Sequence, residues 1–149
     1  MSDSKLTMYS DSWGNFSATV RETVSGGQFV KAMSHIAPSA TQVPSDTLEV
    51  MLANGAGDED MCCGIALDTA ASGERITIAT RGLIKTYAVG ACVAGKGVQA
   101  AADANVPEGV KPMETGSYIV PGPRSIGTSL DDAASGELVF VNLNVGGSL

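Results

Sequence analysis

The residues of this chain that most resemble a chemical motif are 90–96, which read GACVAGK. They match the first seven places of the phosphate-binding loop G-x-x-x-x-G-K, whose eighth place is a Ser or Thr that binds Mg²⁺. Gly97 stands at that eighth place, and the residues after it are too few for the helix whose N-terminus would hold the phosphate. We therefore expect a turn and the start of a strand at 90–96, rather than a nucleotide site.

Two pairs of carboxylates invite an acid–base interpretation: Asp68 with Glu74, and Asp131 with Glu137. Both pairs belong to a short motif, L-D-x-A-A-S-G-E, which occurs twice. Each Asp can accept hydrogen bonds from N–H groups of the turn that follows it, as a helix N-cap does, and the glycine can adopt the positive φ that ends such a turn. A structural role is sufficient, so we expect no catalytic residue and no enzyme.

Other candidate residues lack the partners that chemistry needs. Residues 127–129 begin like a nucleophile elbow but lack its second glycine, and the sole histidine, His35, has no nucleophile or acid near it in sequence. The acids at 58–60 lack the alternating spacing of a calcium loop, and Cys62-Cys63 has no second pair for zinc. We expect a solvated loop at 58–60, reduced thiols, no metal and no cofactor.

Composition excludes several functions. The net charge of −7 argues against nucleic-acid binding, which needs a basic surface, and against anionic membranes. The polar first residues lack the apolar core of a secretory signal, and the apolar runs are too short to span a bilayer, so we expect synthesis in a cytoplasm. Hydrophobic residues make up 44% but aromatic residues only 5%, with 18 glycines, which is typical of short strands joined by tight turns.

The chain repeats itself. Residues 64–74 read GIALDTAASGE and residues 127–137 read GTSLDDAASGE, with eight of eleven positions identical at an offset of 63 (64 to 127). The same offset pairs Gly27 with Gly90 and Val30 with Val93. Internal self-similarity of this kind indicates two copies of one structural unit, about 23–82 and 86–145.

Two copies are too few for a solenoid, so we predict an all-β fold: a single compact β-barrel or sandwich of two tandem similar halves, residues 18–149, preceded by an extended N-terminal arm, residues 1–17. Alternating apolar residues predict the strands. They cover 18–25, 28–33, 47–52, 64–67, 75–80, 83–88, 92–93, 97–101, 117–120 and 137–144.

Two features predict an interaction surface. The polar arm holds Tyr9, Trp13 and Phe16, and large aromatics in such a segment commonly anchor it, either to the protein's own barrel or to a partner. The last strand differs from its counterpart, because Leu138 and Phe140 replace an Arg and a Thr, so residues 138–143 would be apolar on both faces. We expect the arm or, preferably, a neighbouring subunit to cover that second face.

The repeated L-D-x-A-A-S-G-E motif, the glycines at 27, 90 and 82 and the closing strand resemble the small capsid decoration, or cement, proteins of tailed bacteriophages. The resemblance covers about 23–145. It implies a β-rich protein on the outer surface of an icosahedral shell, assembled as a trimer, that bridges neighbouring major capsid proteins. The arm and the segment 38–45 are not part of it.

The preferred hypothesis is therefore a structural protein of a virion, bound to the outer capsid surface, with the major capsid protein and further copies of itself as partners. The alternative is a ligand- or glycan-binding β-module of a virion or cell surface, although few aromatics lie outside the arm to stack on sugars. A nucleotide-hydrolysing enzyme using residues 90–96 is the third and least favoured hypothesis.

Overall fold

A computed structural model of the chain describes residues 7–8, 14–32, 48–55, 58, 62–101, 108–113 and 125–145. Within these ranges no helix is long and apolar enough to cross a membrane. The predicted strand at 117–120, the arm residues Tyr9 and Trp13, and His35 lie outside the described residues.

The regular elements of the described chain are eleven β-strands, which confirms the prediction of an all-β fold. In chain order they are β1 (Thr7–Met8), β2 (Asn15–Val20), β3 (Phe29–Ala32), β4 (Glu49–Leu52), β5 (Cys62–Ala66), β6 (Arg75–Ala79), β7 (Arg81–Tyr87), β8 (Gly97–Ala100), β9 (Val110–Pro112), β10 (Gly127–Ser129) and β11 (Leu138–Asn144).

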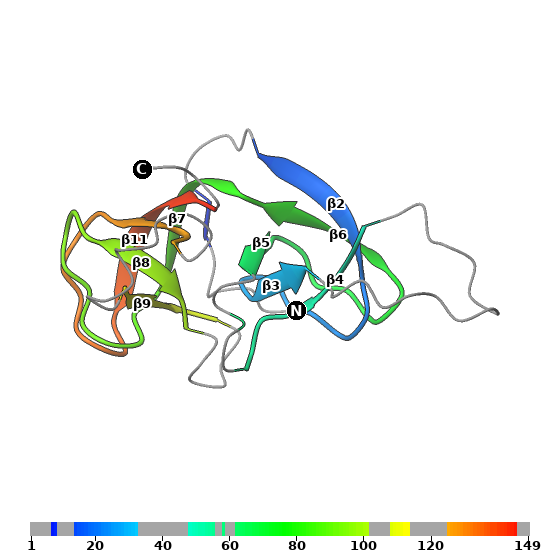
Figure 1. Ribbon diagram of the computed structural model, residues 1–149, viewed down its shortest axis with the longest axis horizontal. Coiled ribbons are helices and arrows are strands. Elements are labelled where there is room, and N and C mark those ends of the chain that lie inside the picture. The colour runs from blue at the N-terminus through cyan, green and yellow to red at the C-terminus, as the bar shows by residue number, and fades with distance from the viewer. Residues whose placement is uncertain are drawn as a thin grey trace.

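The strands form two bodies side by side, joined by the direct run of β6 into β7 (Figure 1). The first barrel is closed and has the order β2-β4-β3-β5-β6. The second sheet has the order β1-β7-β11-β10-β8-β9, and a parallel bridge between Ala88 and Val110 brings its β9 edge back to β7. The parallel pair of Val20 with Val50 occupies the same place in the first barrel. The two halves thus share one topology, but each is a separate curved sheet.

The repeated motif makes the same backbone contacts in both halves. Ala70 bridges Val24, and Ala133 bridges Cys92. Gly73 and Gly136, one residue before the motif's end, have φ values of 92° and 93°, and their N–H groups donate to equivalent carbonyls at 2.7 Å. A residue with a side chain is strained at such a φ, so glycine is required at this turn in both copies.

Upstream of the motif the correspondence differs from the predicted one. Gly27 N–H donates to Ala66 O and Gly95 N–H donates to Ser129 O, both at 2.8 Å. Gly27 therefore corresponds to Gly95, an offset of 68, and the predicted pairing with Gly90 is wrong. The pairing of each strand with the motif fixes its register, whereas the connecting loops differ in length between the two copies. An alignment without gaps cannot reveal such a difference in length.

Each half has buried residues of its own, yet the two are not independent. One buried cluster fills the first barrel with Ala18, Val20, Val30, Val50 and Ile76 among its members. The other combines the interior of the second sheet with residues from the outside of the first barrel, among them Phe29, Ile65 and Ala79. These three residues, on β3, β5 and the end of β6, are therefore packed against the second half.

Close strand crossing selects glycine at a second pair of equivalent positions. A Cβ on Gly64 would collide with the Ile78 side chain and the Ala79 carbonyl, and a Cβ on Gly127 would collide with the backbone of Asn142. Both glycines lie in the strand that precedes the motif, so the duplicated Gly at the start of the repeat reflects close backbone approach.

The second interior is more polar than the first. Thr86 and Ser129 are fully buried where the first barrel has Ala18 and Ala66. Ser129 Oγ donates to Asp131 O at 2.7 Å, whereas Thr86 Oγ1 has no hydrogen-bond partner among the described residues. A buried hydroxyl without a partner destabilises the folded state.

We predict that Thr86→Val raises the free energy of unfolding by about 1 kcal/mol, because it removes an unpaired polar atom at constant shape. Ser129→Ala is the matched control and should lower it by about 1 kcal/mol, because it deletes a satisfied bond. Urea denaturation of the three proteins measures both changes, and a destabilised Thr86→Val protein would show that the hydroxyl does have a partner.

Candidate interaction surface

The motif carboxylates bind the protein's own backbone. Glu74 Oε1 accepts a hydrogen bond from Ala71 N at 2.7 Å, and Glu137 Oε1 accepts one from Ala134 N at 2.7 Å. In each copy the glutamate thus reaches back three residues and holds the turn closed. The positions of these oxygens follow from the architecture of the turn.

The aspartates act across the sheet rather than on the following turn. Asp68 Oδ2 accepts a hydrogen bond from Thr77 N at 3.3 Å, and Asp131 Oδ1 accepts one from Phe140 N at 3.1 Å. The predicted N-cap-like bond to the following turn is therefore wrong. The chain reverses after the motif, which brings the strand residue nine positions later beside the aspartate.

Residues 90–96 are engaged as a turn against the second motif. Five of their backbone N–H groups donate within the protein, whereas the amides of a phosphate-binding loop point at the ligand. The donors and acceptors are Gly90 to Ser135 Oγ, Cys92 to Ala133 O, Ala94 to Asp132 Oδ1, Gly95 to Ser129 O and Lys96 to Val93 O.

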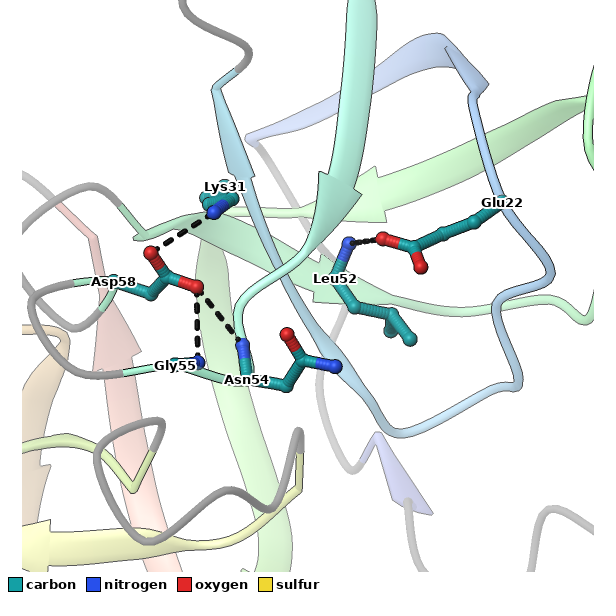
Figure 2. Close-up of polar contacts among 6 residues, drawn as sticks. All are labelled: Glu22, Lys31, Leu52, Asn54, Gly55 and Asp58. Atoms are coloured by element: carbon teal, nitrogen blue, oxygen red, sulfur yellow. Dashed lines mark hydrogen bonds and ion pairs between the residues drawn. The ribbon is translucent and has the colours of Figure 1, made fainter.

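The solvated loop predicted at 58–60 is wrong for Asp58, which is buried, while the other two acids lie outside the described residues. Its carboxylate forms an ion pair with Lys31 Nζ at 2.9 Å and accepts hydrogen bonds from Asn54 N and Gly55 N at 3.2 and 3.0 Å (Figure 2). The loop after β4 needs acceptors for these N–H groups, and a single aspartate supplies them. Asp58 is a structural anchor between this loop and β3.

A neighbouring contact of the first barrel has no counterpart in the second sheet, because both residues that form it are replaced there. Glu22 Oε2 accepts a hydrogen bond from Leu52 N at 3.0 Å, which satisfies the last N–H of β4 (Figure 2). The second sheet has Pro112 at the position of Leu52, so no N–H exists there. Gly90 stands at the position of Glu22, and a Cβ on it would approach the Pro112 ring at 3.3 Å.

The cysteines are free thiols in apolar surroundings. Burial raises the pKa of Cys62 to about 12 and the pKa of Cys63 to about 11. Burial and, secondarily, the Asp131 carboxylate raise the pKa of Cys92. The thiolate is the reactive form, so the raised pKa values keep the thiols unreactive at neutral pH. Cys62 and Cys92 are buried and behave as small core residues, whereas Cys63 is half-buried.

The predicted interaction residues fall in different places. Tyr9 and Trp13 lie outside the described residues, so their role stays a prediction. Residues 15–17 of the predicted arm belong to β2, and Phe16 is half-buried against the cluster that fills the first barrel. Phe16 is therefore at least partly a core residue.

Leu138 and Phe140 point outward from β11, between the buried valines of the same strand. Leu138 is 42% exposed and Phe140 is half-buried. The outward residues further along are Asn142 and Asn144, so the prediction of two apolar faces over 138–143 holds only up to Phe140.

Neighbouring strands extend this apolar surface. Tyr87 lies opposite Leu138 and Lys85 opposite Phe140, with Lys85 Nζ 5.1 Å from the centre of the Phe140 ring. Leu130 follows β10, donates its N–H to Phe140 O and is 49% exposed. We call these residues, with Leu83 beside them, the outer patch: Leu83, Lys85, Tyr87, Leu130, Leu138 and Phe140.

Leu130 was not predicted as part of this surface. Its counterpart in the first motif, Leu67, is half-buried against the cluster that joins the two halves. Leucine in both copies suggests a core position, and only the fold shows that Leu67 is packed against this cluster while Leu130 is not. Finding Leu130 would have required knowledge of which side of each half faces the other half.

The same face of the first barrel is polar. Registers of β2 with β6 and of β7 with β11 place Ser17 where Lys85 stands, Thr19 where Tyr87 stands and Thr77 where Phe140 stands. The barrel topology is the same in both halves, so the fold itself does not require apolar residues there. The outer patch is therefore a feature of the second sheet alone.

Comparison with known proteins gives one informative likeness, and it concerns the fold. No protein-family model matches the sequence, and no curated protein sequence matches it significantly. Among solved structures, the chain is similar to the N base of head fiber gp8.5 of bacteriophage phi29, with a TM-score of 0.51 and 12% sequence identity. The similarity covers 91% of this chain and 96% of that one, so the likeness of fold extends along nearly the whole of both chains.

The two ion pairs, Lys31 with Asp58 and Arg21 with Glu49, should contribute unequally to the free energy of unfolding. We expect Asp58→Ala to lower the free energy of unfolding by about 2–3 kcal/mol, because it leaves Lys31 and two loop amides without their acceptor. Glu49→Ala removes the ion pair with Arg21, which is shorter at 2.7 Å but has side chains 28% and 48% exposed, and should cost less than about 1 kcal/mol. Equal effects in chemical denaturation would contradict a structural role for Asp58.

The raised thiol pKa values predict a loss of stability at high pH. Below the ordinary thiol pKa of 9.0 the thiols are protonated in both the folded and the unfolded protein, and the unfolding free energy keeps its full value. As the pH rises from there toward about 12, the unfolded thiols ionise first and stabilise the unfolded state. We expect the unfolding free energy to fall over this range, and less steeply in Cys62→Ala. A thiol reagent at pH 8 should label the folded protein slowly and the urea-unfolded protein rapidly; rapid labelling of the folded protein would contradict the burial.

Proposed function

We propose that this chain is a structural protein of a tailed-bacteriophage virion that binds the outside of the head and stabilises contacts between major capsid proteins. The observation that carries the proposal is the two-part β architecture, shared along nearly the whole of both chains with a protein named as the base of a phage head fiber. The outer patch on the second sheet supports an adhesive role, because exposed apolar residues grouped on one face commonly mark a protein contact.

The use of the chemical motifs by the fold is consistent with this proposal. The motif carboxylates accept hydrogen bonds from backbone N–H groups, and most amides of residues 90–96 donate to oxygens of the protein itself. Within the described ranges no group of three or more His, Cys, Asp or Glu is placed to hold a metal ion. A binding role does not require these residues to form a catalytic or metal-ligating arrangement.

The same proposal includes self-association, with a trimer favoured, since head-bound proteins that bridge neighbouring capsid subunits follow the symmetry of the shell. Many copies on one lattice would give a large combined stabilisation from modest single contacts. The net charge of −7 would keep the free protein soluble at high concentration before it binds.

The test is binding to shells of the phage that encodes the protein, prepared without it. We expect the purified protein to co-sediment with these shells at a fixed number of copies and to raise the temperature at which they release DNA. Substitution of both Tyr9 and Trp13 by Ala should weaken binding, and the thermal unfolding of the variant, measured alongside, separates a lost contact from a lost fold.

Two results would contradict the proposal. One is the absence of co-sedimentation with intact shells at micromolar protein. The other is specific binding to a glycan with no effect on shell stability, which would favour the ligand-binding module. Equal binding by the Tyr9/Trp13 variant would remove the arm from the contact without touching the rest of the proposal.

A further inference from the structure

We propose that the outer patch of the second sheet is the face that docks on the shell, and that its partner there is an apolar surface carrying acidic side chains. This inference rests on the proposed function and deepens it, because it assigns the contact to one face of one half. The first barrel then projects away from the contact or toward its rim.

The first argument is the comparison of the two halves within one chain. Thr19, Ser17 and Thr77 occupy on the first barrel the positions of Tyr87, Lys85 and Phe140 on the second sheet. Both halves have the same topology, so burial inside the protein does not explain the difference. An external contact at the second sheet does.

The second argument is charge. The outward residues of β7, β11 and β10, with Leu130, include two cations, Lys85 and Arg81, and no acid, although the whole chain carries a net charge of −7. Arg81 already interacts within the protein, so Lys85 is the cation on which the inference rests. The remaining members are Leu83, Tyr87, Thr128, Leu138, Phe140, Asn142 and Asn144. A two-fold contact between copies of this face would supply no acid to pair with Lys85, whereas an acidic partner would complement it.

The third argument is size. The face comprises about ten outward residues, while a stable free-standing interface uses roughly 20–30 residues on each side. A contact this small suits a partner that is presented many times on a lattice, where additional contacts of the same protein add to it. The shell meets this condition better than a free dimer does.

The experiment replaces patch residues by those that the first barrel carries at the same positions. Tyr87→Thr with Phe140→Thr should weaken shell binding at least tenfold, with little change in thermal unfolding, because the first barrel folds with threonine at both places. Lys85→Glu should weaken binding at least tenfold and Lys85→Ser only a few fold. Raising the salt concentration should weaken the wild type more than Lys85→Ser.

The matched control is Ser17→Ala with Thr77→Ala on the same face of the first barrel, which should bind like the wild type. Wild-type binding to the shell with unchanged affinity of the patch variants would overturn this assignment alone. A fall in the solution mass of Tyr87→Thr/Phe140→Thr would also overturn it, since the patch would then lie between copies. Failure of the wild type to bind at all would contradict the proposed function itself.

Discussion

The paired backbone bonds between each repeated turn and the segment opposite it hold both halves in their curved form. Ala70 and Val24 exchange two N–H···O bonds of 2.8 and 2.9 Å, and Ala133 and Cys92 exchange two of 2.8 and 3.0 Å. Each exchange ties the turn after one strand to the turn before another, which closes the end of the unit. The serines, acids and glycines of the motif serve this closure, and that explains why it changes so little between the copies.

Because backbone hydrogen bonds close each half, the fold does not fix the outward side chains. These side chains differ between the two halves. On the first barrel, Phe29 and Ile65 point outward and are buried against the second half. On the second sheet, the positions corresponding to these two carry Gly97 and Thr128, while Leu138 and Phe140 enlarge the neighbouring surface. One unit contributes the internal contact between the halves, and the other presents a face to the outside.

Sequence patterns predicted the all-β class, most of the strands and the duplication, because these depend on local alternation and on identical residues. They did not predict β1 or β9, which lie in the segments assigned to the arm and to a loop. They did not predict the shift from Gly90 to Gly95 as the partner of Gly27, since loop length is invisible to a gapless comparison. Asp58 was assigned to solvent because nothing local shows that Lys31, 27 residues away, lies beside it. Leu130 was missed for a related reason: exposure depends on which face the other half covers.

The shared cluster between the halves also bears on how this protein can be divided. The first half on its own would present the apolar face of Phe29 and Ile65 that the second half covers. Because β6 passes into β7 through Thr80 alone, the halves cannot drift apart without exposing that face. The two halves are therefore expected to fold as one unit, and a fragment cut at Thr80 should be far less soluble than the whole chain.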